Sequence, residues 1–425
     1  MATLTAIVLF GSSAWTQAAN YYISASGALG NGSGSSAANA ADASTPAKYY
    51  AINQAESAAG TVIIYAAGTY LMQTGHTMFN GVTHQGAGID STIIKIAGGT
   101  VSGWQPMWYA GGTLSGFKCL DATIDLNANN QPFWGSSGMS MAFAFPTADH
   151  CTIQRVKFIH MGAKGMESFP IFFIHGSSSK GNSNNNLVDS CIFTQPIASG
   201  NTNGGLTCIY MADSEPGITV DNTNVVSNCQ FLDLKFPNSD LAYTQCVTCP
   251  VAINNFARGV DAFWFIEPGS QSSGNNVFFT GQTVQVTGNT LTDSGMIARI
   301  LMHANGTFAG NLNIQNNTVG MTQHPYTAFG LRGPQGFTIE DYKSGSPSLG
   351  NITIQNNTFT APSPPWTANP VAVLVNPSSP NLFHLASLTV INNRFVNFSG
   401  DGSEIQANTA QVGTYTNRGN TFGPP

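Results

Sequence analysis

The chain has 425 residues, which is enough for a large hydrophobic core. Only 8% of them are charged and 42% are hydrophobic, so few amphipathic helices could keep a hydrated face, and the composition favours an all-β protein. The net charge of −6 leaves no basic surface for phosphates, which argues against nucleic acid and an anionic membrane surface as partners.

The first segment, 1–19, passes from an apolar stretch at 7–10 through small residues to Ala18 and Ala19. This order is typical of a secretory signal peptide, although the basic start of such peptides is missing. No other segment is long and apolar enough to predict insertion into a membrane. We therefore expect a secreted or cell-surface protein whose folded part is a single domain over 20–425.

The clearest helical stretch is PAKYYAINQAESAA, residues 46–59, and a strand is expected directly after it at 61–65. An elongated β-structure has open ends whose unpaired strand edges invite aggregation unless they are covered. We interpret the helix as the cap of the N-terminal end.

Further along the chain, a strand template that ends in a polar corner recurs about every 33 residues. Two copies are nearly the same, NLNIQNNTV at 311–319 and NITIQNNTF at 351–359, and the spacing leaves room for one additional turn at 251–256. Because the units are rich in Val, Ile, Thr, Phe and Asn, each should be a coil of short strands. The equivalent residues of the copies are Ala122, Val156, Cys191, Cys229, Asn289, Asn317, Asn357, Asn393 and Asn420.

Stacking roughly ten such coils predicts a right-handed parallel β-helix, in which equivalent residues lie about 4.8 Å apart. The asparagines of the template would then form a ladder in one interior corner, where their amides hydrogen-bond from coil to coil. Asparagine also tolerates the left-handed backbone of a sharp corner. We therefore assign a structural role to Asn289, Asn317, Asn357, Asn393 and Asn420.

The cysteines give an independent indication of the register. Cys208 follows Cys191 by 17 residues, and Cys246 follows Cys229 by the same distance. Side chains on in-register parallel strands point the same way, and the chain has an odd number of cysteines, seven. We expect stacked, buried free thiols rather than disulfides.

Several segments near the start of the repeats carry a resemblance to a known family. They are GTY at 68–70, GVTHQGAGID at 81–90 with TIIKI at 92–96, and TIDLN at 123–127. Together they resemble the opening of secreted right-handed parallel β-helix proteins of the pectate-lyase-like superfamily. The resemblance implies an extracellular protein acting on polysaccharides, as a lyase or glycoside hydrolase, with adhesins and phage tailspikes as binding relatives. The signatures of its best-known enzymes are missing, so no catalytic residue is carried over.

Acidic residues stand out because charges are scarce. Glu167 and Asp240 each lie 11 residues after a template position, so in-register coils would place them on one face, about 9.6 Å apart at the backbone. Tilted side chains could then reach the roughly 6.5 to 9.5 Å separation of the acid and base in an inverting glycosidase. The alternative is two solvated loop acids.

Asp213 and Glu215 follow a strand expected at 206–211 on the intervening coil, and His175 ends the corresponding strand one coil earlier. Such a cluster could supply a general acid or hold Ca²⁺, and a plain acidic turn is the alternative. Apart from Ca²⁺ the sequence indicates no metal or cofactor.

Arg299, His303 and Arg332 lie in or just after later strands. A lyase needs cations to neutralise a uronate carboxylate and a base to take the C5 proton, although Arg299 could equally be paired within the protein. Tyr210 and Trp264 are aromatic candidates for stacking on sugar rings.

These observations predict a secreted carbohydrate-active enzyme that cleaves glycosidic bonds of an extracellular polysaccharide, by hydrolysis or by β-elimination. The alternative is a non-catalytic adhesin or a self-assembling filament protein of the cell surface. Low charge and a thinly covered C-terminal end, through which copies could associate, favour that alternative, whereas the acids gathered in one band favour the enzyme.

Overall fold

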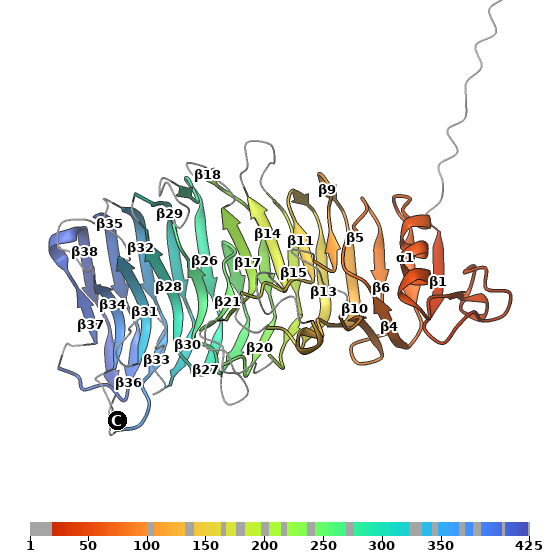
Figure 1. Ribbon diagram of the computed structural model, residues 1–425. Helices are drawn as coiled ribbons and strands as arrows, with labels where there is room; N and C mark the ends of the chain where they lie inside the picture. Colours follow the sequence, from red (N-terminus) through yellow and green to blue (C-terminus); the bar gives the residue numbers. More distant parts are fainter. Residues whose placement is uncertain are drawn as a thin grey trace, which may run out of the picture.

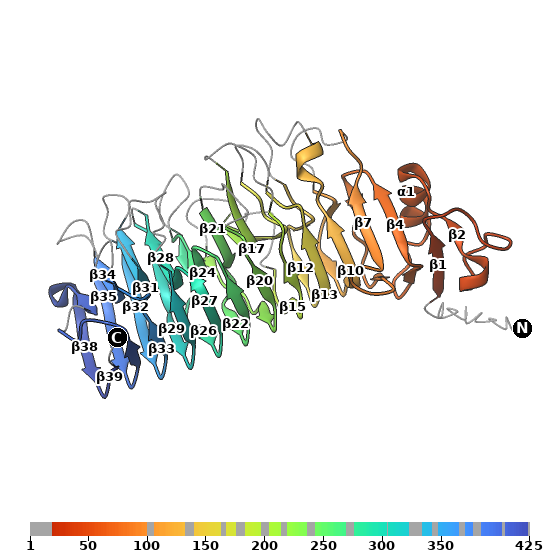
Figure 2. The same ribbon diagram turned by 90° about the horizontal axis from the view of Figure 1, so that it is seen from below.

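The computed structural model describes residues 19–99, 106–131, 140–162, 167–175, 183–196, 204–213, 219–235, 243–268, 276–303, 305–322, 334–341, 347–364, 370–376, 384–401 and 404–423. Nearly all of its regular structure is β-strand, and the strands pair in parallel. The chain winds along one long axis, from α1 at the red end to β39 at the blue end (Figures 1 and 2). The leading segment 1–18 and the predicted signal peptide lie outside the described residues, apart from Ala19.

A complete coil contributes one strand to an 11-stranded sheet, called sheet B here, and then two strands to a 26-stranded sheet, sheet A. The strands of sheet B are β5 (His76–Thr77), β8 (Trp108–Tyr109), β11 (Phe143–Phe145), β14 (Ile171–His175), β17 (Gly205–Asp213), β21 (Tyr243–Val247), β24 (Ala262–Ile266), β28 (Met296–Met302), β31 (Gln335–Asp341), β34 (Val371–Asn376) and β37 (Ile405–Ala407).

Sheet A bends at a corner, so that most coils enter it with one strand before the corner and one strand after it. Its strands before β19 are β1 (Asn20–Ser24), β2 (Ala41–Asp42), β3 (Val62–Tyr65), β4 (Gly68–Met72), β6 (Thr83–Gln85), β7 (Thr92–Ile96), β10 (Lys118–Asp125), β13 (Thr152–Ile159), β15 (Leu187–Asp189), β16 (Ile192–Phe193) and β18 (Thr219–Val220). The later ones are β19 (Val225–Ser227), β20 (Gln230–Leu232), β22 (Val251–Ile253), β23 (Phe256–Arg258), β25 (Val277–Phe278), β26 (Thr283–Thr287), β27 (Thr290–Ser294), β29 (Thr307–Gln315), β30 (Thr318–Met321), β32 (Ser348–Gln355), β33 (Thr358–Thr360), β35 (His384–Ile391), β36 (Arg394–Val396), β38 (Val412–Arg418) and β39 (Thr421–Gly423). A separate two-stranded sheet pairs β9 (Leu114–Ser115) with β12 (Ala148–Asp149). The 3₁₀ turns among the described residues are η1 (Ala37–Asn39), η2 (Ala128–Asn130) and η5 (Thr409–Gln411).

The cap of the N-terminal end is α1 (Pro46–Ala55), which packs on β4 and β5 (Figure 1). It begins at the predicted residue because Thr45 accepts a hydrogen bond from the backbone of Lys48, and proline suits the first turn. The predicted end at residue 59 is wrong, since Glu56 already leaves the helical conformation at φ −93° and ψ 35°.

The interior corner of sheet A holds a hydrogen-bonded column of asparagines. The Nδ2 group of Asn289 donates to Oδ1 of Asn317 at 3.0 Å, and the backbone N–H of Asn289 donates to the same oxygen. Each later pair repeats both bonds, up to Asn420. The column begins one coil earlier than the five template asparagines, at Asn255, in the extra turn for which the spacing left room.

A different residue makes the turn itself. The position before each ladder asparagine has positive φ, with Asn at 254, 316, 356 and 392 and Gly at 288 and 419. Glycine and asparagine are the residues that adopt this conformation at least cost. The Asn-Asn pairs of the template therefore divide two tasks, the first residue turning the chain and the second bonding along the stack.

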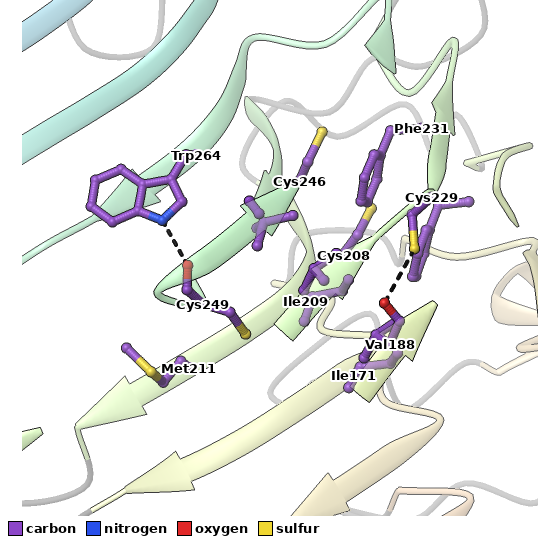
Figure 3. Close-up of a cluster of buried hydrophobic side chains, with 14 of the residues drawn as sticks. Ile171, Val188, Cys208, Ile209, Met211, Cys229, Phe231, Cys246, Cys249 and Trp264 are labelled. Carbon is purple, nitrogen blue, oxygen red and sulfur yellow. Dashed lines mark hydrogen bonds between the residues drawn. The ribbon is translucent and has the colours of Figure 1, made fainter. Parts of the chain in front are cut away.

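The cysteines fill the interior of the middle coils, and all seven are free and buried. Figure 3 shows Cys208, Cys229, Cys246 and Cys249 among apolar side chains. Cys229 occupies the corner position that Asn255 takes on the next coil, and its backbone N–H donates to the Asn255 Oδ1 at 2.8 Å. The register predicted from the cysteine spacing is the observed one, because Leu206 and Thr207 pair with Thr244 and Gln245.

Candidate functional site

Three strands of sheet B do not follow the usual alternation of inward and outward side chains, and this irregularity determines which residues lie on the outer face of the sheet. In β17 the neighbours Cys208 and Ile209 both belong to the main core, so Thr207 and Tyr210 are the residues left on the outer face. The next two coils repeat the shift at Cys246–Val247 and Phe263–Trp264. The outward residues of successive coils consequently lie beside one another.

A cavity of about 230 Å³ lies on this outer face. It crosses five neighbouring coils, from the residues just before β14 to the residue just after β28. Its walls combine two carboxylates, one imidazole, three hydroxyl groups, one amide and an apolar remainder. The lining residues are Glu167, Phe169, Thr207, Tyr210, Tyr243, Gln245, Phe265, Glu267, Leu301 and His303.

Tyr243 reaches across a whole coil to Glu167. Its hydroxyl donates to Glu167 Oε1 at 2.9 Å, and Gly205 of the intervening strand pairs with Tyr243 in register. A Cβ on Gly205 would lie 2.0 Å from Cζ of the Tyr243 ring, so the ring lies over bare backbone. Burial, and then the neighbouring charge of Glu167, raise the pKa of Tyr243 far above its usual range, so its phenol stays protonated.

Gln245 supplies a buried amide on the same strand. Its Oε1 accepts a hydrogen bond of 2.7 Å from Thr207 Oγ1, and the residue is only 2% exposed. Its Nε2 donates to none of the residues that the structure describes, although Gln245 lines the cavity. Buried polar groups are nearly always bonded, so this amide is a donor suited to a ligand oxygen.

The second carboxylate lies beside a histidine at the far end of the cavity. Glu267 follows β24, His303 follows β28, and their Oε2 and Nε2 atoms are 3.9 Å apart. The negative charge of Glu267 also contributes to the raised pKa of Tyr243. The charges of Glu167 and Glu267 therefore both raise the pKa of the Tyr243 phenol.

Aromatic rings form the other end of the cavity and extend beyond it. Tyr210 stacks on Phe169 with ring centroids 4.4 Å apart and on Phe172 at 5.7 Å, within a small apolar cluster outside the main core. Phe265 lies under the guanidinium of Arg299, whose Cζ is 5.7 Å from the ring centroid. Flat apolar faces of this kind suit the C–H faces of sugar rings.

The structure brings together three of the residues singled out from the sequence, Glu167, Tyr210 and His303, around one cavity. His175 and Asp213 end β14 and β17 and pair in register, as the coil spacing predicts. The other candidates, Asp240, Glu215 and Arg332, lie outside the described residues, so the shared face of Glu167 and Asp240 stays a prediction.

Two predicted sugar-binding residues are contradicted. Trp264 is fully buried and its Nε1–H donates to the Cys249 carbonyl at 2.8 Å (Figure 3), because the shifted alternation turns it inward together with Phe263. Arg299 is 1% exposed and its Nη2 donates to Glu340 Oε2 at 2.6 Å, so its charge is compensated within the protein. Neither side chain is free to contact a substrate.

Sequence reasoning missed Thr207, Tyr243, Gln245 and Glu267. The signal for three of them was present, because the offset of 38 residues that relates Cys208 to Cys246 also relates Thr207 to Gln245. Extending it by two residues places Tyr243 beside Gly205. Glu267 carries no comparable signal, since it lies after the end of β24.

Among the residues that the structure describes, no group of three or more His, Cys, Asp or Glu side chains is placed to hold a metal ion. The Ca²⁺ hypothesis rested on Asp213 and Glu215, whose side chains are not described. The described part of the chain also contains no helix long and apolar enough to cross a membrane.

Comparison with known proteins shows the fold. A Family 28 exopolygalacturonase of Yersinia enterocolitica superimposes with a TM-score of 0.52 over 88% of this chain and 75% of its own, at 9% identity. The A-module of the Azotobacter vinelandii mannuronan C-5 epimerase AlgE4 (TM-score 0.47, 16% identity, 95% and 96% of the two chains) and the Streptococcus pneumoniae surface adhesin PfbA (0.41, 12%, 89% and 92%) are also similar. No family model and no curated protein sequence matches. The chain folds as a right-handed parallel β-helix, as its repeats predict.

Proposed function

We propose that this protein is a secreted enzyme that hydrolyses glycosidic bonds of a polysaccharide held along the outer face of sheet B. The observation that carries the proposal is the cavity in which Glu167 and Glu267 flank the half-buried phenol of Tyr243. Two carboxylates beside an aromatic wall are the minimal equipment of a glycoside hydrolase. The leading segment 1–19 supports export.

The environments of the two carboxylates favour different roles. Tyr243 donates a hydrogen bond to Glu167 and so fixes the position of this carboxylate, which suits Glu167 to activate water or attack the anomeric carbon. Glu267, across the phenol, is then the group that protonates the leaving oxygen. The Gln245 amide and the Tyr210 ring would hold the sugar between them.

Hydrolysis fits the described groups better than β-elimination does. Elimination needs a cation at the uronate carboxylate and a base near C5. Arg299 is already bonded to Glu340, and Tyr243 stays protonated because its pKa is raised. The described lining of the cavity contains no lysine or arginine.

The experiment is a polysaccharide screen that records reducing ends and unsaturated products separately, applied to the wild type, Glu167→Gln and Glu267→Gln. Removing a general acid or base costs about 10² to 10⁴ in rate, and each variant should lose activity to that extent while folding normally. Asp90→Asn is the matched control. It removes the same charge from an exposed carboxylate that lies just before β7 of sheet A, whereas the cavity lies on sheet B. Full activity in both glutamine variants would remove the two residues from the mechanism.

A second candidate function is a non-catalytic adhesin or filament protein that associates through its C-terminal end. The observation in its favour is Phe422 of β39, which is 47% exposed and stacks on Phe395 from one side, with ring centroids 5.3 Å apart. A wild type inert on all glycans, together with a concentration-dependent mass in analytical ultracentrifugation, would favour this function over hydrolysis.

A further inference from the structure

We propose that the cavity on sheet B accepts uncharged sugar units and excludes uronates, with Glu167 and Glu267 as the residues that discriminate. The inference rests on the proposed function, since it names the substrate class of the same site. It concerns the charge and the hydrogen-bonding capacity of the described lining rather than the chemical step.

The first argument is the charge of the lining. Glu167 and Glu267 are its two acidic residues, and His303 is the single side chain among the described lining that can carry positive charge. The guanidinium of Arg299, on the same sheet face, is bonded to Glu340 at 2.6 Å. A bound uronate carboxylate would meet the negative charge of Glu167, and also that of Glu267 whenever this residue has not taken up its proton, with at most one cation to offset them.

The second argument is the balance of donors and acceptors. Ionised carboxylates only accept hydrogen bonds, and the Tyr243 hydroxyl already donates to Glu167. Sugar hydroxyls can donate to carboxylates and accept from the Nε2 of Gln245, so the hydroxyls of an uncharged sugar suit both the acids and the amide. A uronate carboxylate can only accept, so it offers no proton to Glu167 or Glu267 at the position where an uncharged sugar carries a hydroxyl.

The third argument is that Glu167 is held in place. Tyr243 is seated over Gly205, where a Cβ would lie 2.0 Å from the ring, and from that seat its hydroxyl bonds to the Glu167 carboxylate. An anchored carboxylate beside buried aromatic rings keeps its field in the cavity, where charges interact more strongly than in water. The fixed Glu167 carboxylate therefore repels the carboxylate of a bound uronate.

The test is affinity electrophoresis in native gels that contain dextran, galactomannan, polygalacturonate or alginate, each run with Ca²⁺ and again with EDTA. The wild type should be retarded by at least one neutral polymer and by neither polyuronate. Each removed pocket charge should strengthen polyuronate binding roughly fivefold, so Glu267→Gln should gain weak retardation and the double variant Glu167→Gln/Glu267→Gln more. Asp90→Asn carries the same net charge as Glu267→Gln and should behave as the wild type.

The outcomes separate this inference from the proposed function. Retardation of the wild type by a polyuronate, with or without Ca²⁺, overturns the inference, and reducing ends released from that polymer would leave hydrolysis standing. A gain of polyuronate binding in Asp90→Asn equal to that in Glu267→Gln shows a net-charge effect and also overturns the inference. Retardation and product formation by none of the polymers overturns both.

Discussion

Two adjacent asparagines with separate tasks explain the corner of sheet A. Asn316 has φ of 56°, and the equivalent positions 288 and 419 are glycine, so this position needs a left-handed backbone and no particular side chain. Asn317 has ordinary backbone but a fully bonded amide, which accepts from Asn289 and donates to Val286 and Asn357. The same residue type is thus used for conformation at one position and for hydrogen bonding at the next.

A matched pair of substitutions tests this division. Asn316→Gly should change the free energy of unfolding by no more than about 0.5 kcal/mol, because glycine adopts positive φ freely. Asn317→Ala should cost about 2 to 4 kcal/mol, since it removes the acceptor of the buried Asn289 backbone N–H and amide and one of the donors to Asn357. Urea denaturation of both variants measures the difference, and equal losses of stability would contradict the assignment.

The seat of Tyr243 over Gly205 gives a prediction for activity. Gly205→Ala should displace the ring, break its bond to Glu167 and lower kcat by about tenfold or more, with little change in thermal stability. Tyr243→Phe, which removes the hydroxyl that bonds to Glu167, should lower kcat to a similar extent.

Gly111→Ala is the control for that experiment. A Cβ on Gly111 would meet no atom within 4 Å, and its backbone is not left-handed, so kcat should match that of the wild type. A Gly205→Ala enzyme with the kcat of the wild type would show that Tyr243 does not position Glu167.

At the residue scale, the sequence predicts positions better than orientations. The template placed Ala122, Val156 and Cys191 in one column, and the registers of β10, β13 and β16 agree. Trp264 could not be oriented, because two consecutive inward residues break the alternation from which orientation is read. The partner of Arg299, Glu340, lies 41 residues away and has no spacing signal of its own.

At the scale of single elements, α1 covers a buried cluster of polar aromatic side chains. His76 of β5 lies 5.0 Å from the Tyr49 ring and 5.1 Å from the Tyr50 ring of the helix, and neither of its ring nitrogens has a hydrogen-bond partner among the described residues. His84 of β6 contacts the Tyr65 hydroxyl at 2.6 Å. Burial lowers the pKa of His76 to about 4 and that of His84 to about 3.

This cluster predicts loss of the cap in acid. Both histidine pKa values are lower in the folded than in the unfolded chain, where they are near 6.5, so the unfolded state takes up protons first as the pH falls. Stability is retained above pH 6.5 and declines between pH 6.5 and about 4, by on the order of 3 kcal/mol for His76. Thermal unfolding between pH 7.5 and 4, with far-UV circular dichroism to follow α1, measures the loss.

His76→Phe provides the comparison for the acid experiment. It removes the titrating group while keeping a ring between Tyr49 and Tyr50, and it should flatten the decline in this pH range. An unchanged pH dependence in this variant would show that the loss arises elsewhere in the molecule.

The extent of α1 shows why element boundaries are harder to predict than elements. Its start has a local signal in Thr45 and Pro46, which cap the first turn. Its end carries none, since ESAA continues a helix-favouring composition although the helix already ends at Ala55. The repeats, in contrast, determine strand positions through contacts that recur in every coil.

At the scale of the whole molecule, the two ends of the stack differ. Each coil contacts only its neighbours, so local stability should depend on how well both faces of a coil are covered. α1 packs on the first coils, where Ile23, Ile63 and Tyr65 are fully or almost fully buried. At the opposite end, the residues of β38 after Val412 are exposed or half-buried, and β39 contains no buried residue.

Hydrogen exchange should therefore be asymmetric along the axis. Amides of β37, β38 and β39 should exchange at least about 100-fold faster than those of β29 and β32, because opening the last coil breaks contacts on one side only. Amides of β1 and β3 should stay protected, since α1 covers that end. Exchange followed by mass spectrometry at neutral pH measures both.

Phe422→Ser, which removes the last ring of the stack on Phe395, should accelerate exchange in β36 and β39 and leave β1 and β3 unchanged. Uniform protection from end to end, or an N-terminal end that opens as readily as the C-terminal one, would refute the view that α1 is the cap that distinguishes them.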